Sequence, residues 1–168
     1  ITPEAVDDKM LSIERKMREN DVKKIMGKFE IDKPYLFYVG NAHPHKNVEG
    51  LIKTFLVLQQ QYPNLKLVLS GYDHYFWQRI KQENRYKGII YTGFVTDEEL
   101  VALYKGAEVF IMPSFEEGFG IPLLEAMSCS CPVVSSKAGS LSDVGGDAVV
   151  YFDPVKRDEM AEKISRVL

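Results

Sequence analysis

From residue 35 onward, short apolar runs alternate with segments in which apolar residues recur at helical spacing. Most of the runs are apolar at consecutive positions, which is typical of parallel strands buried on both faces. The predicted strands are 35–39, 65–69, 89–91, 108–112, 132–135 and 148–152. The predicted helices between and after them are 48–61, 75–84, 97–105, 121–129 and 157–167. Strand–helix alternation repeated in this way predicts right-handed βαβ units and an α/β fold with a doubly wound parallel sheet of about six strands.

The first thirty residues follow another pattern, with two sets of apolar residues at helical spacing. The sets are Val6, Met10, Ile13 and Met17, and then Val22, Ile25, Met26 and Phe29. Asn20-Asp21 between them predicts a break with a helix N-cap. Residues 1–30 are therefore interpreted as a helical lead-in to a domain over 31–168. The start at Ile1 has neither an initiating Met nor a signal sequence and reads like a cut inside a longer chain.

Composition narrows the class of protein. The 168 residues suit one domain, and 45% hydrophobic with 27% charged residues is ordinary globular composition. A net charge of −3 argues against a dedicated nucleic-acid binder, which needs a concentrated basic face. No apolar stretch is long enough for a membrane span. Cys129 and Cys131 are too closely spaced for an easy disulfide, so we expect core-filling thiols and a reducing, cytoplasmic compartment.

Ligands of parallel sheets bind beyond the carboxyl ends of the strands. The loops there are predicted at 40–47, 70–74, 92–96, 113–120 and 136–142. In the first, Gly40 ends a strand and Asn47 is a natural N-cap for the next helix. Lys46 would then lie beside the free amides of that helix and form a phosphate site, the alternative being a solvated lysine. His43 and His45 lack a third ligand at metal-like spacing, so no metal site is predicted.

Loop 113–120 and the helix after it carry two glycines and two carboxylates. Gly118 and Gly120 would let the backbone approach a ligand closely at the mouth of a helix. Glu117 precedes this helix and Glu125 lies one turn inside it, where a partly enclosed carboxylate needs a hydroxyl or cation partner. The alternatives are a glycine loop before a core helix, or a glycosidase. The glycosidase fits poorly because both carboxyls come from one short segment.

Residues 113–136 resemble the signature of the retaining group 1 glycosyltransferases of the GT-B fold. Its core is two glutamates with seven residues between them, here Glu117 and Glu125, followed by Ala126-Met127 and Cys131-Pro132-Val133-Val134. The similarity continues through 35–47, 92–95 and 147–154. The resemblance implies a Rossmann-like, nucleotide-sugar-binding half of a GT-B enzyme. It also implies that the N-terminal, acceptor-binding half is absent from this chain.

The resemblance implies roles for individual residues. Glu125 would accept hydrogen bonds from the ribose of the donor, and Glu117 would contact the transferred sugar. Lys46 would neutralise the diphosphate, so that Glu117 and Lys46 are the expected catalytic residues. The rest of the expected donor site is Gly40 and Asn41, the amides around Gly118, Phe119, Gly120 and Ile121, and the backbone near Phe94 and Val95. No metal or cofactor is expected besides the nucleotide sugar, which is the substrate.

One position departs from the family pattern. Many relatives have an arginine where this chain has Asn41, which leaves Lys137 and His45 as candidates for the second phosphate cation. The resemblance is strongest to mannosyltransferases in three segments, namely Gly40-Asn41, 44–47 and 151–154. GDP-mannose is therefore the favoured donor. The acceptor would be a glycan or a lipid-linked glycan, with peripheral membrane contact as an option. The alternatives are a UDP-hexose transferase, a nucleotide-sugar epimerase and a nucleotide-sugar-binding module without turnover.

Overall fold

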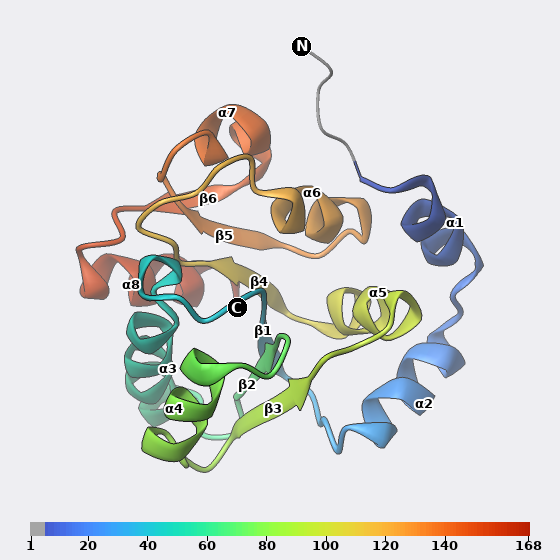
Figure 1. The fold of residues 1–168 in the computed structure, drawn as a ribbon, viewed down its shortest axis with the longest axis horizontal. Coiled ribbons are helices and arrows are strands. Elements are labelled where there is room, and N and C mark those ends of the chain that lie inside the picture. Colours follow the sequence, from blue (N-terminus) through green and yellow to red (C-terminus); the bar gives the residue numbers. More distant parts are fainter. Residues whose placement is uncertain (1–5) are drawn as a thin grey trace.

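The computed structural model describes residues 6–168 and contains one six-stranded parallel sheet with the strand order β3-β2-β1-β4-β5-β6 (Figure 1). The strands are β1 (Tyr35–Val39), β2 (Lys66–Ser70), β3 (Ile89–Gly93), β4 (Val109–Met112), β5 (Val133–Ser136) and β6 (Val150–Phe152). The predicted parallel α/β fold is confirmed, and the strand ends differ from the prediction by at most two residues.

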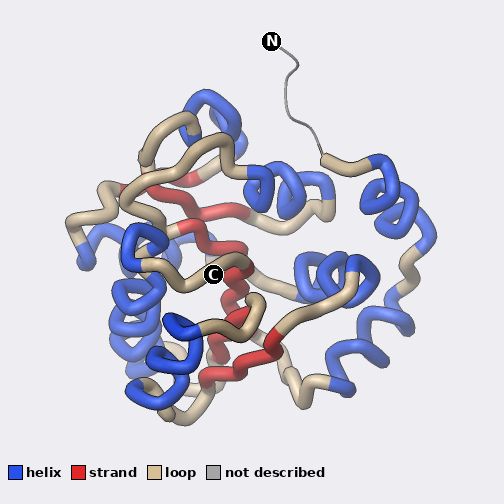
Figure 2. Tube along the Cα trace, viewed as in Figure 1, coloured by secondary structure: helices blue, strands red, loops and turns tan. Residues whose placement is uncertain are grey.

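Helices cover both faces of the sheet (Figures 1 and 2). One face carries α3 (Val48–Gln61), α4 (Tyr75–Glu83) and α8 (Arg157–Val167). The other carries α5 (Asp97–Gly106), α6 (Ile121–Ser128) and α7 (Leu141–Gly145), with α1 (Asp8–Lys16) and α2 (Glu19–Lys28) packed outside α5. Among the described residues, no helix is long and apolar enough to cross a membrane.

Alternate residues of each strand belong to two separate cores. In β1, Leu36 packs with the α3 and α4 side, whereas Phe37 packs with the α5 side, and both are fully buried. In β4, Ile111 and Phe110 divide in the same way. Burial of both faces explains why these strands are apolar at consecutive positions. Cys129 and Cys131 are buried free thiols in the core on the α5 side, as expected.

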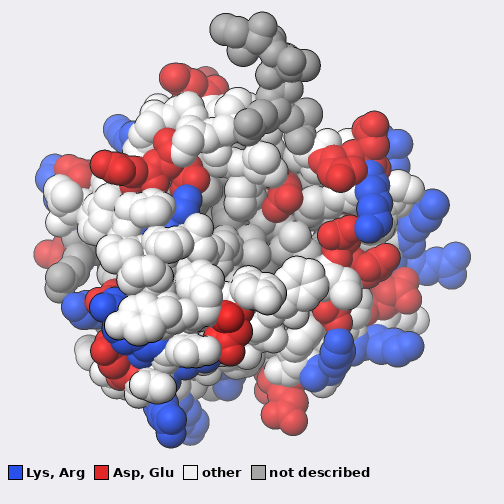
Figure 3. Space-filling view, in the orientation of Figure 1, with Lys and Arg blue, Asp and Glu red and all other residues white. Residues whose placement is uncertain are grey.

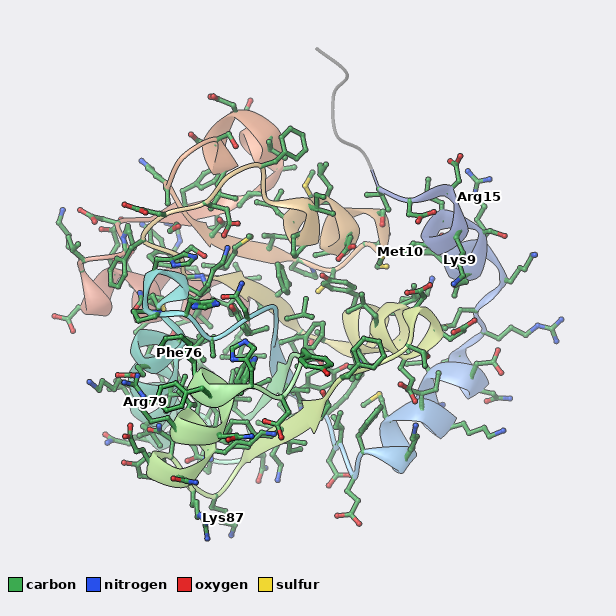
Figure 4. The ribbon with its side chains drawn as sticks, viewed as in Figure 1. Lys9, Met10, Arg15, Phe76, Arg79 and Lys87 are labelled. Atoms are coloured by element: carbon green, nitrogen blue, oxygen red, sulfur yellow. The ribbon has the colours of Figure 1, made fainter. Side chains whose placement is uncertain are left out.

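The break in the helical lead-in is not where the sequence predicted it. The first helix ends at Lys16 with Met17 as its C-cap, and the second has Arg18 as its N-cap, so Asn20 and Asp21 lie inside α2. The Asp21 carboxylate accepts a hydrogen bond of 3.0 Å from the Arg18 amide, so it caps the helix instead of ending it. The predicted break was therefore wrong by three residues. Figure 4 shows Met10 on the side of α1 that faces the domain, where it is 5% exposed. The predictions for residues 1–5 fall outside the described residues.

The short helix α7 was not predicted, and its first two residues fall in the predicted loop 136–142. Its five residues are too few for a helical period to emerge from the sequence, and two flanking glycines, Gly139 and Gly146, are typical of loops. The Leu141 side chain anchors this helix and is fully buried.

The chain reverses direction across the sheet between β1 and β4. From β1 it continues outward through β2 and β3, and from β4 it continues outward on the opposite side through β5 and β6. The two loops that leave β1 and β4 therefore diverge and leave a crevice at the carboxyl edge. A switch point of this kind is where doubly wound sheets bind ligands.

Candidate functional site

A cavity of about 320 Å³ lies at this switch point. Its wall comes from β1, β4, the two loops that follow them and the first turn of α6. The lining residues are Tyr38, Val39, Gly40, Asn41, Lys46, Met112, Ser114, Glu117, Phe119, Gly120, Ile121 and Pro122. The structure thus brings together most of the predicted site residues from two segments about seventy positions apart. The face in Figure 3 carries most of its charged side chains toward the periphery, notably over α1 and α2.

Lys46 and Glu117 form an ion pair in the cavity wall. The Lys46 ammonium lies 2.7 Å from Oε1 and 2.8 Å from Oε2 of Glu117. The two side chains are 16% and 10% exposed, so both charges are largely withdrawn from water. The sequence predicted Lys46 beside the amides of α3. It directly precedes the N-cap of that helix, and its ammonium binds Glu117 in the loop between β4 and α6, which the sheet topology places opposite it.

Asn47 is the N-cap residue of α3, as predicted, but its side chain makes no capping hydrogen bond. Its backbone is left-handed, with φ of 55°, and its side-chain amide donates a 3.0 Å hydrogen bond to the Pro113 carbonyl. A second bond of 2.7 Å runs from the Phe115 amide to the His45 carbonyl. These bonds join the loop after β1 to the loop after β4. They therefore fix the position of Lys46 relative to Glu117.

Two serines support the Glu117 carboxylate from inside the protein. The Ser114 hydroxyl donates to Oε2 of Glu117 at 2.9 Å. The Ser114 carbonyl in turn accepts a 2.7 Å hydrogen bond from the Ser136 hydroxyl on β5. Both serines are buried, with exposed fractions of 1% and 0%. Sequence reasoning missed Ser114, although it lies in the loop singled out by its glycines and only three positions before Glu117.

Loop 137–140 packs against the backbone of Glu117 and Gly118. Gly139 has φ of +58°, and a Cβ atom at this position would lie 2.1 Å from the Glu117 carbonyl oxygen. The Ser140 hydroxyl also donates to the Gly118 carbonyl. The sequence marked this loop only by its place after a strand. The close backbone approach explains why it carries glycine.

The first turn of α6 forms another part of the wall. Gly120 precedes the helix in a left-handed conformation, with φ of 85°, and Ile121 and Pro122 are its first residues. Amides at a helix N-terminus have no intrahelical partner, and the helix dipole places positive charge there. The cavity therefore combines one ammonium group with a helix N-terminus, an arrangement suited to a phosphate.

Glu125 does not line this cavity. It lies farther along α6 and accepts a 3.0 Å hydrogen bond from the hydroxyl of Tyr104, a fully buried residue of α5. Burial raises the pKa of Glu125, the Tyr104 hydrogen bond opposes that rise, and the nearby carboxylate of Asp97 adds to it. Asp97 follows the loop with the predicted base contacts Phe94 and Val95, which also lie outside the cavity. Gly118, another predicted site residue, is exposed beside the cavity wall.

The two residues considered for a second phosphate-binding cation also lie outside the cavity. Lys137 and His45 are exposed, and Lys46 is the one Lys, Arg or His side chain among the described lining residues. The His43 ring lies 5.8 Å from His45, 5.5 Å from His74 and 4.8 Å from Phe76, a residue of α4 that Figure 4 labels. Over residues 6–168, no group of three or more His, Cys, Asp or Glu side chains is arranged to hold a metal ion.

The position of Glu125 predicts a stability change in Glu125→Gln. A carboxyl whose pKa rises on folding holds its proton more tightly when folded, so stability falls as pH rises from 4.5 through the raised pKa. The neutral amide removes this loss. We expect Glu125→Gln to melt at a higher temperature than the wild type near neutral pH and at the same temperature below about pH 4. Melting curves between these limits test this, with the exposed Glu116→Gln as control. A constant difference at every pH would contradict it.

Comparison with known proteins adds an independent finding. A sequence model of the family described as "Glycosyl transferases group 1" matches residues 21–168. Over 142 residues the chain is 42% identical to O-antigen chain mannosyltransferase B of Escherichia coli, which covers 80% of this chain and 36% of that protein. The chain thus spans about a third of that relative's length.

Two solved structures share the fold. The C-terminal domain of a glycosyl transferase group 1 family protein from Francisella tularensis superposes with a TM-score of 0.72 at 25% identity, covering 89% of this chain and 83% of that one. Anabaena HepE, solved in complex with UDP and glucose, superposes with a TM-score of 0.76 at 22% identity, covering 93% and 44%.

Proposed function

This chain belongs to the group 1 glycosyltransferases, and from that premise we propose that it forms the donor-binding domain of a retaining hexosyltransferase. The observation that carries the proposal is the cavity at the switch point, which Lys46 and the first turn of α6 both line. A transferase of this kind releases a nucleoside diphosphate. Stabilising the negative charge that grows on this leaving group is the main electrostatic task of the site.

The two glutamates take separate roles in this proposal. Glu117 lies in the cavity wall beside Lys46, where it would accept hydrogen bonds from hydroxyls of the transferred sugar. Glu125 lies on the side of α6 that faces α5, where it would accept hydrogen bonds from the ribose. A nucleotide sugar would then lie along α6, with its base near Phe94 and Val95 and its diphosphate at Lys46.

The proposed donor is GDP-mannose, and the proposed transferred group is mannose. The 42% identical relative is named as an O-antigen chain mannosyltransferase, which supports mannose and a glycan or lipid-linked acceptor. The HepE structure, which holds UDP and glucose, favours a UDP-hexose as the second candidate.

A thermal-shift panel on the chain tests the proposal. GDP and GDP-mannose are expected to raise the melting temperature more than UDP, ADP or UDP-glucose at equal concentration, because a ligand that binds only the folded state stabilises it by mass action. A larger shift with UDP and UDP-glucose would select the second donor. No shift with any nucleoside diphosphate or nucleotide sugar would contradict a donor-binding domain.

Binding of the nucleoside diphosphate is expected to survive excess EDTA. In the proposed arrangement the positive charge comes from Lys46 and the amides of α6, which act without a metal ion. Titration calorimetry with and without the chelator checks this. A loss of affinity of about tenfold or more that Mg²⁺ or Mn²⁺ restores would show that a metal carries part of the counter-charge.

A further inference from the structure

We propose that Glu117 is an internal counter-ion that Lys46 must leave when ligand binds, and that this exchange makes the site prefer the intact nucleotide sugar over the nucleoside diphosphate. The inference rests on the proposed function and deepens it. It assigns specificity between substrate and product to one ion pair and to Ser114, which holds the Glu117 carboxylate.

The exchange follows from the contacts and the burial of the Lys46–Glu117 pair. The Lys46 ammonium contacts both carboxylate oxygens of Glu117, and neither side chain is more than 16% exposed. A diphosphate arriving at Lys46 therefore meets a carboxylate already bound to that ammonium. The like charges repel in a site with little water to screen them. The ammonium has three N–H donors and makes two hydrogen bonds to Glu117, so a diphosphate that accepts more than one hydrogen bond from Lys46 must displace the carboxylate.

After the exchange, the two carboxylate oxygens of Glu117 differ in their hydrogen-bond donors. Oε2 keeps the hydroxyl of Ser114, whose own carbonyl is held by Ser136. Oε1 has Lys46 as its one hydrogen-bond donor among the described residues and loses it. A largely buried carboxylate oxygen without a donor is unfavourable, so this loss opposes binding.

A sugar attached to the diphosphate removes that penalty. Its hydroxyl groups are hydrogen-bond donors, and they reach the carboxylate that lies next to the phosphate-binding ammonium. Ser114 keeps the carboxylate in place, so that Oε1 faces the ligand instead of turning away. The nucleoside diphosphate has no hydroxyl at this end. Once transfer has removed the sugar, Lys46 can return to Glu117, which favours release of the product.

Glu117→Gln tests the exchange by titration calorimetry on the chain with GDP and GDP-mannose. Because the amide no longer competes for Lys46, GDP is expected to bind this variant about tenfold tighter than wild type. The preference for GDP-mannose over GDP should fall at the same time. A gain of affinity cannot arise from a misfolded variant. Ser114→Ala should keep GDP affinity within about threefold of wild type and still reduce the sugar preference.

The control is Glu116→Gln, an exposed neighbour that should change neither affinity. Unchanged or weaker GDP binding by Glu117→Gln, with wild type binding normally, overturns the inference and leaves the proposed function standing. If GDP, GDP-mannose, UDP and UDP-glucose all fail to bind wild type, the proposed function itself falls, and the inference falls with it.

Discussion

Lys46→Ala is expected to weaken binding of a nucleoside diphosphate by about 2 kcal/mol or more, which is roughly thirtyfold in affinity. Lys46 is the one cationic side chain among the described residues that line the cavity, and Asn41, which also lines it, is uncharged. Its removal has a second effect, because Glu117 is 10% exposed and loses its counter-ion. The diphosphate then meets an uncompensated carboxylate. Binding of the nucleoside, which has no phosphate, should barely change.

Titration calorimetry with GDP and guanosine measures this difference, and two controls sharpen it. Lys137→Ala removes a lysine outside the cavity and should leave GDP binding unchanged. The double variant Lys46→Ala with Glu117→Gln should bind GDP better than Lys46→Ala alone, because it lacks the unpaired carboxylate. Equal GDP affinity in wild type and Lys46→Ala would place the phosphate site elsewhere.

Gly139→Ala is expected to lower the free energy of unfolding by about 2–4 kcal/mol and to weaken binding of the nucleotide sugar. The residue has φ of +58°, where an L side chain is strained. The added Cβ would also lie 2.1 Å from the Glu117 carbonyl oxygen, which is backbone and cannot rotate away. The loop that presents Glu117 must therefore move, and its contacts with Lys46 and Ser114 change with it.

Gly146→Ala separates the two causes. Gly146 also has a positive φ, +50° with ψ of −140°, but a Cβ there would have no atom within 4 Å. This control should lose only backbone strain, about 1–3 kcal/mol, and keep wild-type ligand binding. Urea denaturation gives both stabilities. Wild-type binding of the nucleotide sugar by Gly139→Ala would show that the close approach to Glu117 does not shape the site.

The regular elements of this protein could be predicted because their signals are local. A strand buried on both faces, such as β1, needs consecutive apolar residues, and an amphipathic helix such as α3 needs apolar residues at helical spacing. The starts and ends of both were predicted correctly. Local signals failed where few residues carry them. The five residues of α7 are too few to show a period, and Asp21 reads equally well as a helix break or as a capping residue inside the first turn.

The candidate site likewise has parts that the sequence predicted and parts that it did not. Loops 40–47 and 113–120 were identified from the sequence because glycines, a lysine and glutamates follow apolar strands there. Their meeting is a consequence of strand order, which places β4 beside β1 although β2 and β3 lie between them in the chain. The sequence did not predict that Lys46 pairs with Glu117. Nor did it show that Ser114 supports this glutamate and Tyr104 supports Glu125.

What the sequence by itself determined is the alternation of strands and helices, the loops that carry polar and glycine residues, and a family pattern over most of the chain. Helices form hydrogen bonds between near neighbours in the sequence, and buried strands require consecutive apolar residues, so a linear pattern contains both. Only the tertiary structure decided which loops face each other and which charges share a partner. The Lys46–Glu117 pair joins residues 71 positions apart. Contacts at that separation depend on the order in which strands pack into the sheet, and no local pattern of residues specifies that order.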